Sequence, residues 1–253
     1  MKTALDPFVI WLLRHADDNL ILAQRLAEWS AQAPDIEEDI ALTNIGLDHL
    51  GQARALLAHA GRVEGTGRDE DRLAFFRTDR DFYNLILVEQ PNGDFAHTIA
   101  RQFFFDAYQV PFWTGLEIST EPTVAGIAGK AVKEARYHLR HSSAWVVRLG
   151  DGTTESHQRM QDAVDGLWRF TGELFAGDSV DDDVRATGLG IDVESLRSVW
   201  LATAERVFAE ASLSIPDDSF QVTGGRRGVH SEHLGYVLAE MQWMQRTYPG
   251  LEW

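Results

Sequence analysis

The sequence lacks cysteine, any apolar run long enough to cross a membrane, and any excess of positive charge. The absence of cysteine excludes disulfides, thiolate metal sites and cysteine nucleophiles. A membrane span would need about 18 or more consecutive apolar residues. The formal net charge of −16 disfavours nucleic acid as a partner, because both molecules would be negative. The apolar stretch 8–13 is short and lacks a small-residue cleavage site, so we do not interpret it as a signal peptide and expect a cytoplasmic location.

Two catalytic signatures are also missing. No Gly-x-Ser-x-Gly turn is present, which argues against a serine hydrolase of the nucleophile-elbow type. No G-x-G-x-x-G follows a strand pattern, so a dinucleotide-binding fold is not expected.

The sequence does contain helical periodicity along most of its 253 residues. No convincing strand alternation appears, and Gly and Pro divide the chain into long segments. Four predicted helices have about 25 to 27 residues, or roughly 40 Å each, and they form two consecutive pairs. This pattern predicts an all-α, ferritin-like four-helix bundle over about 6–150, with additional C-terminal helices over about 154–248, in a single domain 1–253. The predicted helices cover residues 6–32, 35–61, 71–88, 95–119, 122–149, 154–175, 193–211 and 232–248.

The two long-helix pairs carry acidic and imidazole residues at related positions. Ferritin-like di-iron bundles place one carboxylate on one helix and a Glu-x-x-His on its neighbour, twice over. Residues three or four apart share a helix face, so both side chains can reach one metal. Here Asp18 and Asp48 are 30 residues apart, and Asp106 and Glu134 are 28 residues apart, as two antiparallel hairpins of similar length would require. The full candidate set is Asp18, Asp48, Gln52, Asp106, Glu134 and His138.

The ligand types depart from the di-iron pattern. Near Asp48 the plausible ligand slots hold His49 and Gln52, and an amide is a poor substitute for imidazole. In the second pair, Tyr137 stands three residues after the glutamate and the histidine follows at the fourth. Nearby arginines could replace a metal's charge through ion pairs with buried carboxylates. From spacing alone, a vestigial metal site and ordinary polar helix residues are equally good interpretations.

A glycine-rich segment over 223–233 precedes the last predicted helix and contains Arg226 and Arg227. Glycines, arginines and a helix start could together hold an anion such as a phosphate. The alternative is a tight loop whose arginines dock on the acidic body of the chain, and the lack of Walker-type spacing favours it.

Seven blocks, in order along the chain, resemble one family. They are NLILAQRLAEW (19–29), NIGLDHLGQAR (44–54), NLILVEQPNGDFA (84–96), TIARQFFFDA (98–107), KEARYHLR (133–140), LWRFTGELF (167–175) and TGGRRGVHSEHLG (223–235). Together they resemble the non-catalytic, structural subunit of the multicomponent phenylacetyl-CoA epoxidase, whose fold is ferritin-like.

The resemblance implies a subunit of aerobic phenylacetate degradation that holds no metal and pairs with a paralogous catalytic subunit. That partner would carry the di-iron centre, bind phenylacetyl-CoA and epoxidise its ring with O2. Electrons would come from NADPH through a separate reductase with flavin and an iron–sulfur cluster. The resemblance carries over no catalytic residue and no cofactor to this chain, and Asp48, Gln52, Glu134 and His138 are expected only as remnants of a site.

Three further expectations remain open at this point. The isolated chain is expected to be able to form a homodimer, because it would expose a partner surface. The loop with Arg226 and Arg227 could contact the coenzyme A phosphates of a shared substrate, or it could be an interface element. The alternative function is a di-iron oxygenase in its own right, with the atypical ligands Asp18, Asp106, Glu134 and His138.

Overall fold

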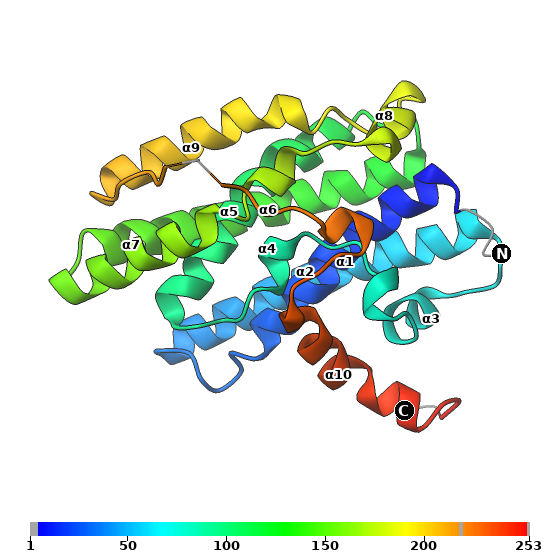
Figure 1. Cartoon of the computed structure of the whole chain (residues 1–253), viewed down its shortest axis with the longest axis horizontal. Coiled ribbons are helices and arrows are strands. Elements are labelled where there is room, and N and C mark those ends of the chain that lie inside the picture. The colour runs from blue at the N-terminus through cyan, green and yellow to red at the C-terminus, as the bar shows by residue number, and fades with distance from the viewer. Residues whose placement is uncertain (1–4, 218–219, 252–253) are drawn as a thin grey trace. The chain divides into compact units, whose positions relative to one another are not determined.

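The computed structural model describes residues 5–217 and 220–251. These residues are 72% helical, with ten α-helices and no strand, which confirms the predicted all-α class and the helices added after the long ones. The chain divides into two compact units, which are Met1–Gln90 with Gly224–Trp253, and Pro91–Thr223. No described helix is long and apolar enough to cross a membrane. Figure 1 traces the order of the helices along the chain.

The first unit is built on a hairpin of two long helices, α1 (Pro7–Ala27) and α2 (Ile36–Glu64). The ring of Phe8, at the start of α1, contacts the ring of His59, near the end of α2, so the two helices are antiparallel. Helix α2 is capped by Gly65, whose left-handed φ of 67° favours glycine. The first predicted pair of helices is therefore present, and α2 extends beyond the predicted end at residue 61.

Helix α1 is buried on nearly all sides, and this decides what its polar residues must do. A helix that is buried all round has no solvent-facing stripe, so each polar group needs a partner inside the protein. The buried polar side chains of α1 are Arg14, His15, Asp17, Asp18, Asn19 and Arg25.

The prediction of one helix over 71–88 is wrong. The segment instead forms three short pieces: α3 (Glu70–Phe75), a 3₁₀ helix (Asp79–Asp81) and α4 (Ile86–Glu89). Between the last two pieces the backbone amide of Tyr83 donates to Oδ2 of Asp17 at 2.9 Å, and that of Leu85 donates to Oδ1 of Asp18 at 2.8 Å. These bonds to α1 replace the intrahelical bonds that a continuous helix would make.

The chain returns to the first unit through its C-terminal segment. A 3₁₀ helix (Gly225–Arg227) is followed by α10 (Glu232–Thr247). Gly225 lies so close to residue 84 that a Cβ atom would come within 2.1 Å of the Asn84 carbonyl oxygen. Only glycine allows this approach, which brings the neighbouring Arg226 to the helix hairpin.

The second unit is built on a second hairpin, α5 (Phe95–Leu116) and α6 (Pro122–Gly150). The helix predicted over 154–175 ends earlier, at Trp168, and a 3₁₀ helix (Gly172–Phe175) follows it. An aromatic cluster forms part of the core of this unit. Its members include Phe104, Trp168, Trp200 and Phe208. The remaining helices of the unit are α7 (Thr154–Trp168), α8 (Ser179–Ala186) and α9 (Arg197–Glu210).

Candidate functional site

The six residues predicted as a vestigial site are divided between the two units, and we describe each unit by itself. The first-unit members are Asp18, Asp48 and Gln52, and the second-unit members are Asp106, Glu134 and His138.

The carboxylate of Asp18 lies inside the first unit and is held by protein groups on both oxygens. Nη1 of Arg226 donates to Oδ1 at 3.0 Å and Nη2 to Oδ2 at 2.8 Å, while the Leu85 amide also donates to Oδ1. Nη1 of Arg226 donates in addition to the carbonyl oxygens of Arg14 and Tyr83, at 3.2 and 3.1 Å. Burial raises the pKa of Asp18 to about 6, and the Arg226 guanidinium and the Leu85 amide limit the rise. The positive charge beside this carboxylate therefore comes from an arginine.

A second buried carboxylate of α1, Asp17, pairs with Arg77. Nη1 of Arg77 donates to Oδ2 at 2.9 Å, and Nη2 contacts Oδ1. Both side chains are buried, so the pair is shielded from water. Such a two-point contact between a guanidinium and a carboxylate is among the stronger polar interactions in proteins.

The third buried charge pair of this unit joins Glu89 to His230. Oε2 of Glu89 lies 2.9 Å from Nδ1 of His230 and accepts from Nδ2 of Asn84, while the Ser231 amide donates to Oε1 at 2.6 Å. Nε2 of His230 lies 2.9 Å from the carbonyl oxygen of Phe82. Because a carboxylate and a carbonyl both accept, both ring nitrogens carry protons and the imidazole is positively charged. Burial lowers the pKa of His230, but the hydrogen bond and charge of Glu89 outweigh burial and raise it above its ordinary value.

On α2 the candidate carboxylate is less buried than the histidine and the amide beside it. Asp48 is half-buried, whereas His49 and Gln52 are buried. Nδ1 of His49 lies 2.7 Å from Oδ1 of Asn19, whose Nδ2 donates to the carbonyl oxygen of His15. This arrangement assigns the Nδ1 proton to His49, since the amide oxygen can only accept.

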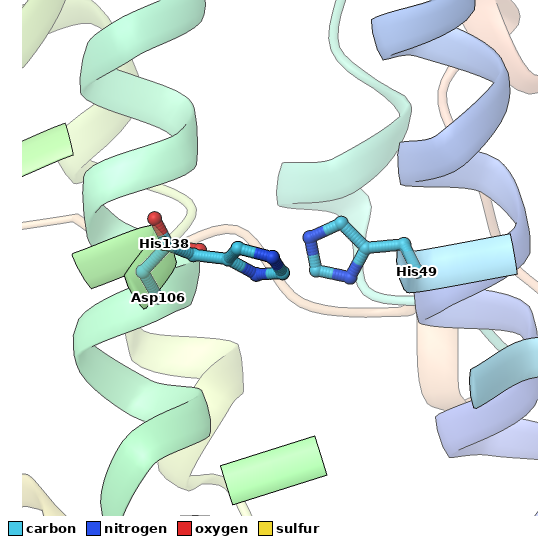
Figure 2. Close-up of side chains that lie close together, drawn as sticks. All are labelled: His49, Asp106 and His138. Atoms are coloured by element: carbon cyan, nitrogen blue, oxygen red, sulfur yellow. The ribbon is translucent and has the colours of Figure 1, made fainter. Parts of the chain in front are cut away.

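In the second unit, Asp106 is buried and hydrogen bonded at both oxygens. Nε2 of Gln102 donates to Oδ1 at 2.6 Å, and Oγ of Ser142 donates to Oδ2 at 2.8 Å. Burial raises the pKa of Asp106 to about 8, although both hydrogen bonds oppose the rise. A ring nitrogen of His138 lies within 4.8 Å of an Asp106 carboxylate oxygen, and Figure 2 shows these two side chains on α5 and α6. A pKa raised this far favours the protonated carboxyl at neutral pH, in which Oδ2 would donate to Oγ of Ser142 instead of accepting from it.

Glu134 lies on α6, one turn before His138. It is half-buried, and its Oε1 lies 3.1 Å from Nζ of Lys130, one turn earlier on α6, whose side chain is 73% exposed. The two residues form an i,i+4 pair in which the lysine is exposed and the glutamate side chain is 14% exposed.

Within each unit, these carboxylates already have partners in the protein. Iron takes deprotonated carboxylate and imidazole ligands. Asp18 holds a guanidinium with both oxygens, the raised pKa of Asp106 favours its protonated form, and Glu134 pairs with a surface lysine. An iron ion at Asp18 would have to displace the Arg226 guanidinium, and one at Asp106 would have to displace a proton.

The two arginines of the glycine-rich loop lie in different environments. The Arg226 side chain is only 11% exposed and is bound to Asp18, as the docking alternative expects. Arg227 is exposed. The prediction of an anion site or interface in this loop stays a prediction, and it now depends on Arg227.

Sequence reasoning did not predict the ion pairs of Asp17 with Arg77 and of Glu89 with His230. One signal for the first of these was available, because Asp17 and Asp18 are adjacent in an otherwise apolar helix. Consecutive helical residues point about 100° apart, so a narrow solvent-facing stripe cannot hold both carboxylates, and at least one has to find a cation inside the protein.

Comparison with known proteins agrees with the resemblance seen in the sequence blocks. The sequence model of a family described as phenylacetic acid catabolic protein matches residues 2–253. A relative from Escherichia coli (strain K12), which is a component of the 1,2-phenylacetyl-CoA epoxidase, is 51% identical over 249 residues. That alignment covers 98% of this chain and 100% of the relative.

Proposed function

The chain belongs to the phenylacetic acid catabolic protein family, and from this premise we propose that it is a non-catalytic subunit of a phenylacetyl-CoA epoxidase. In this role it binds and stabilises a paralogous catalytic subunit. The di-iron centre belongs to that partner, and the NADPH, flavin and iron–sulfur chemistry belongs to a separate reductase. The chain itself holds no metal and supplies no catalytic group.

The ion pair between Asp18 and Arg226 is the observation that carries this proposal. A ferritin-like hairpin that binds iron needs its buried carboxylates open toward the metal. Here the C-terminal segment places Arg226 against Asp18 and the charged His230 against Glu89. Breaking a buried pair by removing one partner costs about 3–5 kcal/mol, so a metal ion that displaced Arg226 would bind against a penalty of this order.

Co-purification with a catalytic subunit tests the proposal. We expect the two chains to form a complex, with iron found in the catalytic chain alone when the chains are separated and analysed. We also expect Asp106→Asn to leave the epoxidation rate of the complex unchanged, because the protonated Asp106 serves the structure of this chain and not the reaction. The exposed Asp162 offers a matched control, Asp162→Asn.

Two results would overturn the proposal. One is stoichiometric iron in this chain after separation. The other is an Asp106→Asn complex that assembles normally but no longer epoxidises its substrate, which would favour the alternative of a di-iron oxygenase with atypical ligands.

A further inference from the structure

The second unit contains a cavity of about 210 Å³ beside its aromatic cluster. The lining includes Trp168, Phe175 and Trp200, which are 5%, 5% and 3% exposed. An apolar cavity of about 150 Å³ in a protein core is large enough to bind benzene. This cavity, which we call the tryptophan cavity, therefore has room for one aromatic ring with a short substituent.

The three aromatic rings of the lining contact one another at tilted angles. The ring centroids of Trp168 and Trp200 are 5.4 Å apart with an angle of 44° between the planes. Those of Phe175 and Trp200 are also 5.4 Å apart, with an angle of 63°. Aromatic rings favour offset and edge-to-face contacts with further rings at such distances. A ligand ring in the tryptophan cavity would extend this cluster, which favours an aromatic ligand over a purely polar one.

The two lining tryptophans differ in the hydrogen bonding of their indole groups. Nε1 of Trp200 donates to the carbonyl oxygen of Phe104 at 2.9 Å. Nε1 of Trp168 is also buried, but no residue in the described part of the chain accepts its proton. A buried donor without an acceptor destabilises a protein, and the indole nitrogen can only donate. A ligand oxygen that reached this N–H would remove that cost.

Arg197 brings a positive charge to the exposed edge of the tryptophan cavity. It belongs to the lining, is exposed to solvent, and has its guanidinium carbon 6.0 Å from the centre of the Phe175 ring. A guanidinium binds a carboxylate through two parallel hydrogen bonds. Arg197 and the Trp168 indole are both donors, whereas a carboxylate only accepts. The polar groups at the cavity therefore fit an anionic acceptor better than an ammonium group.

One acidic residue, Glu205, also lines the tryptophan cavity. Arg197 and Glu205 both lie on α9, and their backbone positions are about 12 Å apart along the helix at 1.5 Å per residue. Charges on exposed groups are largely screened beyond the Debye length, which is about 8 Å at physiological salt. The two ends of the cavity therefore differ in charge, and an anion is favoured at the end that holds Arg197.

We infer that the tryptophan cavity binds a small aromatic carboxylate, with its ring among Trp168, Phe175 and Trp200 and its carboxylate at Arg197. The volume limits the ligand to one ring with a short acidic side chain, so a nucleotide-sized molecule is excluded. The inference concerns the second unit alone and does not rest on the proposed function. A chain that binds no such acid could still be a non-catalytic subunit.

Isothermal titration calorimetry of the isolated full chain tests the site, with phenylacetate as the probe. Phenylacetamide has nearly the same shape without the charge, and acetate has the charge without the ring. We expect phenylacetate to bind at a single site with a dissociation constant of about 1 mM or lower. Each control ligand should bind at least about tenfold more weakly, because it lacks either the charge-assisted hydrogen bonds or the buried ring.

Substitutions on α9 test where the ligand binds. Arg197→Gln should weaken phenylacetate at least about tenfold and phenylacetamide by less than about twofold, whereas a merely structural role would weaken both equally. Arg206→Gln is the matched control, since Arg206 is an arginine of the same helix with a 59% exposed side chain, and it should change neither affinity. Leu201→Trp should abolish binding of both ligands, because the larger side chain would fill the cavity that Leu201 lines. Circular dichroism should show the same helix content in all variants.

Four results would overturn the inference. These are no saturable binding of phenylacetate up to about 10 mM, phenylacetamide that binds as tightly as phenylacetate, equal losses for Arg197→Gln and Arg206→Gln, and phenylacetate binding that survives Leu201→Trp. If Leu201→Trp loses helix content, fluorine NMR of the wild type labelled with 5-fluorotryptophan replaces it. Of the eight tryptophan resonances, those of Trp168 and Trp200 should then shift with phenylacetate, and shifts confined to the others would contradict the site.

Discussion

Replacing Asp106 by asparagine should stabilise this chain at neutral pH, which is unusual for a change at a buried, hydrogen-bonded residue. Asparagine has the shape of a protonated aspartic acid. Its oxygen can accept from Gln102, and its amide can donate to Oγ of Ser142, so both contacts of Asp106 survive. The variant differs from the wild type chiefly in that it has no proton to lose.

The size of the effect follows from the pKa of Asp106, which burial raises from 3.8 to about 8. A carboxyl group whose folded pKa is raised binds protons more readily in the folded than in the unfolded chain. Stability therefore falls as pH rises from about 4 to about 8, by about 1.4 kcal/mol per pH unit. Between pH 3.8 and pH 7 the loss of stability amounts to about 4 kcal/mol, and Asp106→Asn should recover up to that amount of unfolding free energy at pH 7.

Urea unfolding of wild type and Asp106→Asn across this pH range measures the effect. The advantage of the variant should be smallest near pH 4 and should grow until about pH 8. The exposed Asp162→Asn serves as the control and should show no such growth. If Asp106→Asn were less stable than the wild type at pH 7, or if its advantage did not grow with pH, then Asp106 would be ionised in the folded chain and the protonated assignment would be refuted.

Two further predictions concern the charge pairs of the first unit. Arg226→Met should lower the free energy of unfolding by about 3–5 kcal/mol in denaturant titrations, because Asp18 stays buried without its cation, and adding Asp18→Asn should restore much of it. Arg227→Met should change the free energy of unfolding by less than about 0.5 kcal/mol. Equal losses for the two arginine variants would contradict the ion pair between Asp18 and Arg226. The folded pKa of His230 is raised above 6.5, so its pair with Glu89 contributes stability that is complete below pH 6.5 and is lost as pH rises through the folded pKa. The deficit of His230→Gln relative to wild type should therefore shrink at alkaline pH, and a deficit that grows there would count against a charged histidine.

The long helices could be predicted from the sequence because their determinants are local. Apolar periodicity and N-terminal caps define them, as when Oδ1 of Asp35 accepts from the Glu38 amide and that of Asp94 from the His97 amide. The prediction of one helix over 71–88 failed for a non-local reason. Backbone amides of this segment bond to carboxylates on α1 more than 60 residues earlier in the chain, and no local pattern records such acceptors.

For the candidate site too, the sequence could predict only what local patterns determine. Spacing alone left open whether the candidate residues face the interior or solvent, and the structure buries Asp18, Gln52, Asp106 and His138. Helical periodicity alone could have excluded Asp48 from the candidate site.

The inward face of α2 follows helical steps of three and four, and these steps select His49 and exclude its neighbour. The buried members of this face include Leu42, Ile45, His49, Gln52 and Leu56. The cation of Asp18 could not be foreseen, because Arg226 is 208 residues away and reaches the hairpin only through the close approach of Gly225 to Asn84.

Metal titration of the isolated chain decides whether its buried carboxylates can hold iron. Equilibrium dialysis against Fe(II) and against Mn(II), followed by metal analysis, gives the number of ions bound per chain, and the catalytic subunit provides the positive control. We predict no stoichiometric tight binding, because Asp18 is paired with Arg226 and the raised pKa of Asp106 favours its protonated form. Two tightly bound ions per chain would contradict the proposed non-catalytic role.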